Sequence, residues 1–97
     1  MKLGLVLATR EDLPHAHALA LAARRARIEV ALFAMDAGVH ALAAAPQAAT
    51  ELLEADCEIT VCSNSAVGVA LVDGIVRGSQ DDHAAIVATA DRLIALC

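Results

Sequence analysis

Among the three cysteines of the chain, Cys62 has the position best suited to chemistry. It ends the short apolar run Glu58–Cys62 and directly precedes Ser63-Asn64-Ser65, residue types that cap helices. We therefore expect a helix from Ala66 to about Val72. The free N–H groups and the dipole at a helix N-terminus stabilise an anion, so they would favour a thiolate at Cys62. The residues alone leave open whether this thiol is reactive or simply packed in the core.

The other two cysteines have positions that are less suited to chemistry. Cys57 precedes the same apolar run, at the opposite end from Cys62, and we expect it to be a small core or boundary residue. Cys97, at the C-terminus, is expected to be incidental. The chain contains no C-x-x-C pair, and an odd number of cysteines does not suit a disulfide framework. Neither a structural zinc site nor a set of disulfides is predicted.

The histidines do not form a metal-binding pattern either. His15 and His17 are two residues apart and diverge on a helix, while His40 and His83 are isolated in the sequence. We expect all four to be solvated helix residues and expect no metal. The glycine-rich patterns that cradle phosphates, GxxxxGK[ST] and GxGxxG, are absent. No cofactor is predicted.

Short apolar runs alternate with helical segments along the chain, and this alternation predicts how the candidate residues are positioned. The predicted strands are 2–8, 28–35, 58–62, 75–76 and 92–96. The predicted helices are 13–27 after an Asp12 cap, 39–45, 46–55, 66–72, and a last one to Ala90 that starts at a Ser79-to-Asp82 capping box. This order is typical of βαβ units. We predict one domain over residues 1–97, a three-layer α/β/α sandwich with a mainly parallel sheet of about five strands.

Ligands of open parallel sheets bind beyond the carboxyl ends of the strands, where several polar side chains should converge. This edge would bring Arg10, Asp36 and Arg77 towards Cys62 and the Ser63–Ser65 segment. We expect Asn64 and Ser65 to donate hydrogen bonds to a group on Cys62, and Arg10 or Arg77 to supply positive potential. Asp36 and the Ser63–Ser65 turn could alternatively bind a small molecule.

The composition excludes several classes of function and suggests self-association. The apolar set AVILMFWYC makes up 59% of the 97 residues, with 24 alanines but only one aromatic side chain. A net charge of −5 and the scarcity of aromatic side chains for base stacking argue against nucleic-acid binding. The longest apolar stretch has seven residues, against about 20 for a membrane span. We therefore expect a cytoplasmic protein whose excess apolar surface closes against other subunits.

Several motifs, taken in order, resemble the DsrE/DsrF/DsrH-like family, which includes sulfur-relay subunits. The chain has an F-x-x-x-G-V segment from Phe33 to Val39, a strand ending in Val-Cys at Cys62, and a Gly-Ser turn before the last helix. It closes with the A-D-R-L-I segment at Ala90 to Ile94. Relay subunits often have Arg where this chain has Val67, and the following segment to Arg77 is shorter here.

The resemblance implies a cysteine that accepts sulfane sulfur as a persulfide and passes it to a partner protein, and Cys62 is the matching position. It also implies dimers, trimers or hexamers, or hetero-oligomers with related subunits, together with sulfur donor and acceptor proteins. Whether such a carrier counts as an enzyme stays open. Two other functions remain: a non-catalytic assembly or regulatory module in which Cys62 is packed, and small-molecule binding at the same edge of the sheet.

Overall fold

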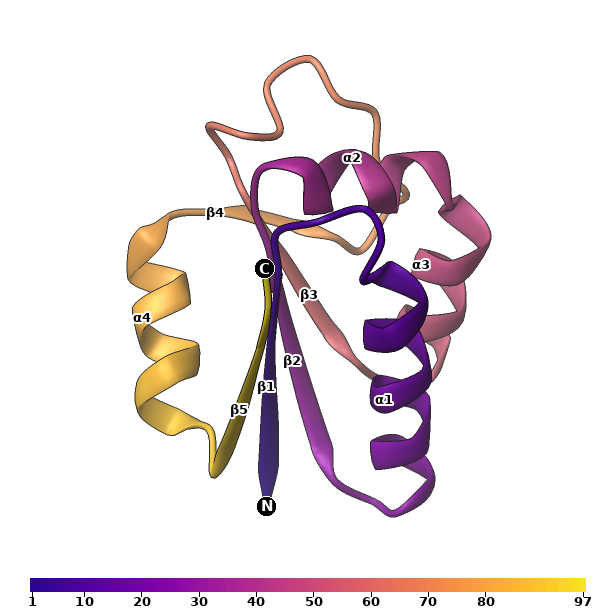
Figure 1. Cartoon of the computed structure of the whole chain (residues 1–97), viewed down its shortest axis with the longest axis vertical. Coiled ribbons are helices and arrows are strands. Elements are labelled where there is room, and N and C mark those ends of the chain that lie inside the picture. The colour runs from indigo at the N-terminus through magenta and orange to yellow at the C-terminus, as the bar shows by residue number, and fades with distance from the viewer.

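All five strands run parallel in one sheet, in the order β4-β3-β2-β1-β5. The computed structural model describes all 97 residues. Figure 1 shows the strands side by side, with the C-terminus at the end of the sheet opposite the N-terminus. The carboxyl ends of the strands therefore meet at one edge, as predicted. The strands are β1 (Lys2–Leu7), β2 (Glu29–Ala34), β3 (Glu58–Cys62), β4 (Val76–Gly78) and β5 (Arg92–Leu96).

Helices cover both faces of the sheet, which confirms the predicted α/β sandwich. The chain moves steadily from β1 to β4 and then returns to place β5 on the other side of β1. Because βαβ crossovers are right-handed, the two directions of travel put their helices on opposite faces. In Figure 1 only α4 lies on one side of the sheet, and the other three helices lie on the other. The helices are α1 (Leu13–Arg25), α2 (Ala37–Ala44), α3 (Pro46–Glu54) and α4 (Gln80–Thr89).

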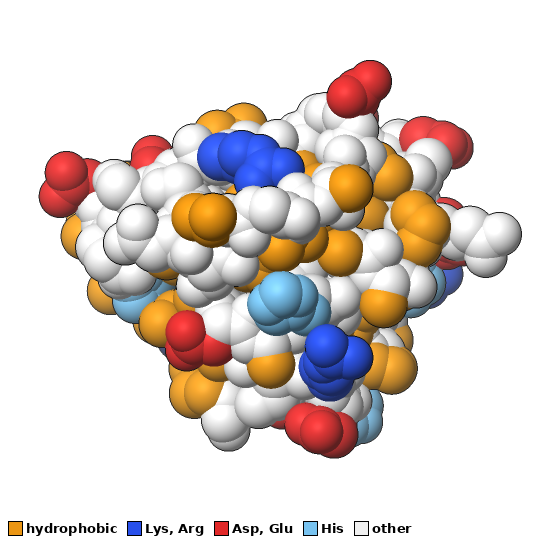
Figure 2. All heavy atoms as spheres, turned by 90° about the horizontal axis from the view of Figure 1, so that it is seen from above, with side chains coloured by type: hydrophobic (Ala, Val, Ile, Leu, Met, Phe, Trp, Pro, Cys, Tyr) orange, Lys and Arg blue, Asp and Glu red, His pale blue; other side chains and the backbone are white.

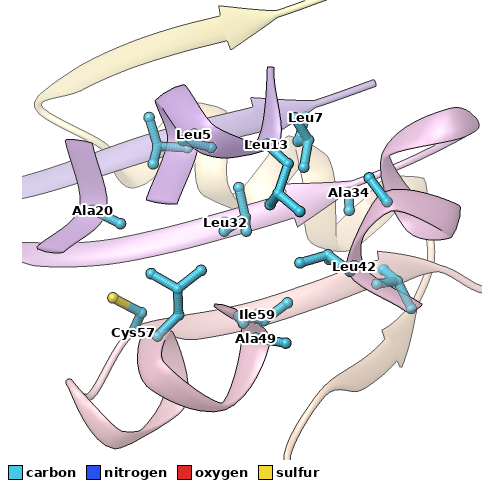
Figure 3. Packing of buried hydrophobic residues seen from close by; sticks show 14 of the residues in the cluster. Leu5, Leu7, Leu13, Ala20, Leu32, Ala34, Leu42, Ala49, Cys57 and Ile59 are labelled. Carbon is cyan, nitrogen blue, oxygen red and sulfur yellow. The ribbon is translucent and has the colours of Figure 1, made fainter. Parts of the chain in front are cut away.

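The two faces of the sheet are packed very differently. Side chains alternate along a strand, so Leu32 of β2 points into the core under α1–α3, and its neighbour Phe33 points towards α4. The core under the three helices holds 18 buried residues, part of which is drawn in Figure 3. The cluster under α4 holds four. The α4 face is therefore the thin layer of the sandwich.

One close contact fixes how α2 leaves the sheet. A Cβ atom at Gly38 would overlap the backbone carbonyl oxygen of Leu7, at the end of β1. That backbone cannot move freely, since the same oxygen accepts a hydrogen bond of 3.0 Å from the N–H of Met35. Glycine is thus required where the chain turns from β2 into α2. This explains the glycine of the F-x-x-x-G-V segment in physical terms.

Three local predictions are wrong. Residues 66–72 form no helix; the chain makes turns from Ser63 to Gly68 and then continues irregularly. The fourth strand begins at Val76, so Arg77 lies within it rather than after it. Asp12 precedes α1 without capping it: its carboxylate accepts a 2.6 Å hydrogen bond from the Thr9 hydroxyl, and this bond is the main cause of the lowered pKa of Asp12.

None of the helices is long and apolar enough to cross a membrane.

Replacing Gly38 by alanine is expected to lower the free energy of unfolding by about 2 kcal/mol, because the new methyl group must displace backbone at the end of β1. Denaturant titration followed by circular dichroism measures this change. As a control, Ala44→Ser at an exposed position of the same helix should change the free energy by only about 0.5 kcal/mol. Equal stability of the Gly38→Ala variant and the wild type would contradict the argument.

Candidate functional site

Cys62 is the last residue of β3, and its side chain lies on the α4 face of the sheet. Ile59 and Val61 point into the larger core, so the alternation of the strand directs Cys62 the other way. There it packs with Phe33 and Ile86, and 8% of the residue is exposed. The thiol therefore lies at the carboxyl edge of the sheet, just beneath the surface.

A turn takes the place of the predicted helix after Cys62. Its first hydrogen bond, 3.0 Å long, runs from the N–H of Ala66 to the carbonyl oxygen of Cys62. The N–H of Ser63 donates to the carbonyl oxygen of Gly78 on β4 at 2.9 Å, which anchors the start of the turn to the sheet. Between these anchors, Asn64 and Ser65 present their backbone N–H groups to the thiol. The turn thus supplies the donors that we expected from a helix N-terminus.

These donors hold the pKa of the Cys62 thiol below its usual value. The largest effect comes from the backbone N–H of Ser65, followed by the Ser65 hydroxyl. Burial opposes them, since it disfavours a charge. The N–H of Asn64 and the side-chain amide of Gln80 lower the pKa further. Every group that stabilises the thiolate is neutral.

Gln80 is a residue of the site that the sequence analysis missed. It is the first residue of α4, and a capping box fixes the start of that helix. The Ser79 N–H donates to the Asp82 carboxylate at 2.8 Å, and the Ser79 hydroxyl accepts from the Asp81 N–H at 3.2 Å. The predicted capping box is therefore confirmed. This capping box was a signal for Gln80 in the sequence. It places the start of α4 directly after β4, and β4 lies beside β3, so the first residue of the helix is expected near the end of β3.

His83 is not the solvated residue that its isolation in the sequence suggested. Its ring stacks on Phe33, with a centroid distance of 5.1 Å and an interplanar angle of 18°. Its Nδ1 lies 3.3 Å from the Oε1 atom of Gln80. His83 therefore braces the same first turn of α4 that contacts Cys62.

Asp36 reaches the site through its backbone. Its N–H donates a 3.0 Å hydrogen bond to the hydroxyl oxygen of Ser65, which is one of the groups that lower the pKa of Cys62. An open depression of about 490 Å³ lies beside this contact. Five residues line it: Asp36, Ala37, His40, Asn64 and Ser65. Figure 2, which looks onto the carboxyl edge, shows apolar, basic, acidic and histidine side chains intermixed there.

The two arginines predicted to supply positive potential are placed differently. The Arg77 guanidinium donates to the carbonyl oxygens of Ala66 and Val69, at 2.9 and 2.6 Å. Arg10 is exposed, and its side chain makes no hydrogen bond or ion pair. Neither guanidinium is among the groups that shift the pKa of Cys62. The structure thus brings Asn64, Ser65 and Asp36 together around Cys62, and ties Arg77 to the backbone of the turn.

The remaining cysteines and histidines lie elsewhere. Cys57 is buried at the other end of β3, within the larger core (Figure 3), and this burial raises the pKa of its thiol. Cys97 is exposed. On the outer helices, His15 lies 3.2 Å from Asp12 and His17 lies 3.0 Å from Glu51. No group of three His, Cys, Asp or Glu side chains is placed to hold a metal ion.

The opposite pKa shifts of Cys62 and Cys57 predict different alkylation profiles. A lowered pKa means that Cys62 becomes a thiolate at a lower pH than an ordinary cysteine, whereas Cys57 needs a higher pH. Iodoacetamide should modify Cys62 before Cys57, and the midpoint of the Cys62 rate against pH should lie below that of free cysteine. Cleavage after Glu58 separates the two residues for mass spectrometry. Identical profiles for both thiols would contradict this prediction.

Comparison with known proteins agrees with the motifs. No curated protein matches the chain. The family model of the DsrE/DsrF-like family matches residues 1–96, which is nearly the whole chain and includes the strand that ends at Cys62. This match confirms the resemblance found in the sequence: the chain belongs to the DsrE/DsrF-like family.

Proposed function

We propose that this protein is a sulfur carrier that accepts sulfane sulfur as a persulfide on Cys62 and passes it to a partner protein. The observation that carries the proposal is the thiol itself, placed at the carboxyl edge of the sheet with four hydrogen-bonding groups that lower its pKa. Membership of the DsrE/DsrF-like family supports a role in sulfur relay. The buried Cys57, with its raised pKa, is unsuited to the same task.

The transfer needs no oxidant, because the sulfur moves between thiolates. The Cys62 thiolate attacks the terminal sulfur of a donor persulfide, forming a new S–S bond while the donor's S–S bond breaks. The donor leaves as a thiolate. In the second step an acceptor thiolate attacks the terminal sulfur on Cys62, and Cys62 leaves as a thiolate in turn. A lowered pKa at Cys62 raises the fraction of attacking thiolate and makes Cys62 a better leaving group.

The surrounding residues are suited to both steps. The N–H groups of Asn64 and Ser65 and the amide of Gln80 stabilise negative charge at the sulfur, both before loading and after release. Asp36 keeps the Ser65 hydroxyl in place through its backbone N–H. Arg10 is the exposed, uncommitted cation after β1, and we propose that it attracts the negative charge of an approaching donor.

Loading of Cys62 can be measured by intact-mass spectrometry. After incubation with a cysteine desulfurase and cysteine, the protein should gain the mass of one sulfur atom, which a reductant removes. Cys62→Ser should abolish the gain, because the attacking sulfur is lost. Cys57→Ser is the matched control and should load like the wild type. An unmodified Cys62 under conditions that load an established carrier would sink the proposal.

A non-catalytic assembly module is the second candidate. It is supported by the packing of Cys62 against Phe33 and Ile86, since a residue only 8% exposed could serve the core alone. In that case alkylation of Cys62 should be slow and should not follow a lowered pKa. The same mass measurement would then find no sulfur on the wild-type protein.

We further propose that the carrier self-associates through the outer surface of α4. This helix buries only Ile86, while its exposed side chains include Val87 at 45%. Leu93, on the neighbouring β5, is 43% exposed. Apart from Gln80 in the first turn, the other exposed residues of α4 are small or acidic, and small side chains let helices approach closely.

The charges around α4 favour a second copy of the chain, lying antiparallel. Asp81 and Asp82 lie at the start of α4. At its other end the Lys2 ammonium donates to the Thr89 hydroxyl at 3.1 Å. Arg92 lies three residues after Thr89, so the two cations outnumber the one carboxylate between them, Asp91, which accepts a 2.7 Å hydrogen bond from the Lys2 N–H. A two-fold axis across α4 would place the acidic start of one helix near the basic end of the other.

Replacing Val87 by aspartate is expected to weaken self-association at least tenfold, because a charge would be buried in the contact. Light scattering over a range of protein concentrations measures the effect. Val67→Asp is the matched control: Val67 is 79% exposed on the turn after Cys62, outside α4, and its change should leave the mass unaltered. A wild-type protein that stays monomeric at all concentrations would contradict the proposed contact.

A further inference from the structure

We propose that Arg77 is a positioning residue for Cys62, acting by clamping the turn that follows it rather than by its charge. The inference rests on the proposed function, since it concerns the same thiol, but it assigns the control of that thiol to a side chain on another strand. The clamp consists of two hydrogen bonds, from Nη1 to the carbonyl oxygen of Ala66 and from Nη2 to that of Val69.

The turn is held at both ends. At its start, the Ser63 N–H donates to the carbonyl oxygen of Gly78, which is in register with Cys62 across the β3–β4 pair. At its far end, the two bonds from Arg77 measure 2.9 and 2.6 Å. Asn64 and Ser65, whose N–H groups face the thiol, lie between these anchors. Releasing the Arg77 end would therefore free the donors of Cys62.

An arginine is needed here because residues 66–72 are not helical. In a helix the carbonyl of Ala66 would accept from a backbone N–H four residues further along. In this structure the N–H of Val69 instead bonds the Ala66 oxygen at 3.0 Å, and the carbonyl of Val69 has no backbone donor. Arg77 provides donors to both oxygens from a single planar group. The ammonium of lysine is a point charge without this fork.

The place of Arg77 in the sheet favours a positioning role over an electrostatic effect on Cys62. Side chains alternate along β4, and Gly78 is on the α4 face, where a Cβ would meet Asp82 and Thr60. Arg77 is therefore on the opposite face, the one covered by α1–α3, where it is an exposed residue at the edge of the sheet, whereas Cys62 belongs to the cluster under α4. No charged side chain, Arg77 included, is among the groups that shift the pKa of Cys62.

The two explanations of Arg77, by its charge and by turn geometry, predict different alkylation midpoints for Arg77→Lys. In a background carrying Cys57→Ala and Cys97→Ser, where Cys62 is the only thiol, we compare wild-type Arg77 with Arg77→Lys and Arg77→Met by the pH profile of alkylation. If Arg77 clamps the turn, both substitutions should raise the midpoint by about one pH unit, a tenfold loss of thiolate near neutrality. If it acts by charge, Arg77→Lys should keep the wild-type midpoint.

Salt provides an independent readout. An effect of charge at an exposed edge weakens as ionic strength rises, whereas an effect of turn geometry does not. The raised midpoint of Arg77→Met should therefore persist in high salt. Arg25→Lys, an exposed arginine on α1 with no partner, is the matched control and should leave the midpoint unchanged. A wild-type midpoint in Arg77→Lys, or a difference that salt removes, overturns the inference.

Two further measurements keep the inference apart from folding and from sulfur transfer. If the Arg77 variants do not unfold cooperatively, the alkylation midpoint of Gly68→Ala replaces theirs as the test. The φ angle of Gly68 is 72°, so alanine strains the same turn while Arg77 is unchanged. A raised midpoint supports the inference, and an unchanged one overturns it.

A wild-type protein that takes up no sulfur yet shows the Arg77 effect contradicts the proposed function alone; one that loads sulfur without that effect contradicts the inference alone.

Discussion

The alternation of side chains along β3 is the constraint on which the site depends. Ile59 and Val61 belong to the core of 18 residues, so Cys62 must face α4. A shift of the register by one residue would turn the thiol into the larger core, away from the turn and from Gln80. The two cysteines at the ends of this segment show how the face of the sheet affects the pKa of a thiol. Cys57 lies in the larger core and its pKa is raised by burial, whereas Cys62 has its pKa lowered by donors.

The stabilisation of the thiolate by neutral groups has consequences for transfer chemistry. A cation beside the sulfur would attract a negatively charged donor but would also hold the loaded persulfide. Backbone N–H groups, a hydroxyl and an amide act over a short range and demand an accurate geometry. If Cys62 carries sulfur as we propose, the turn from Ser63 to Gly68 determines its reactivity, and the anchors of the turn on β4 belong to the site. The proposed chemistry at β3 then depends on the edge strand beside it.

Most of the fold could be predicted from the sequence because the signals are local and mutually consistent. Apolar runs of strand length alternate with helical segments, and Ser79 with Asp82 marks the start of α4 as the capping-box pattern requires. The glycine of the F-x-x-x-G-V segment was visible too, but its reason, the carbonyl of Leu7 lying against it, exists only in the folded chain.

The site was harder to predict because its key segment is decided by tertiary contacts. Residues 66–72 are apolar enough for a short helix, but Gly68 adopts a positive φ, and Val69, Leu71 and Val72 pack against the larger core. Arg77 then satisfies carbonyl oxygens that a helix would have paired internally. Sequence spacing placed Arg77 near Cys62 correctly but could not tell which face of the sheet it occupies. The predicted strand ended at Val76, so Arg77 was expected after it, and no face of the sheet could be assigned to its side chain.

The unequal layers of the sandwich explain why the thiol is on the α4 side. Three helices cover one face, and burial there raises the pKa of the Cys57 thiol. On the other face α4 buries a single side chain, Ile86, so the cluster around Cys62 stays close to the surface. The first turn of α4 contributes Gln80 to the thiol, and Phe33 braces that turn through His83. The thin layer therefore combines a weakly buried helix with the donors of the site, and any partner that covers α4 also acts on the residues that control Cys62.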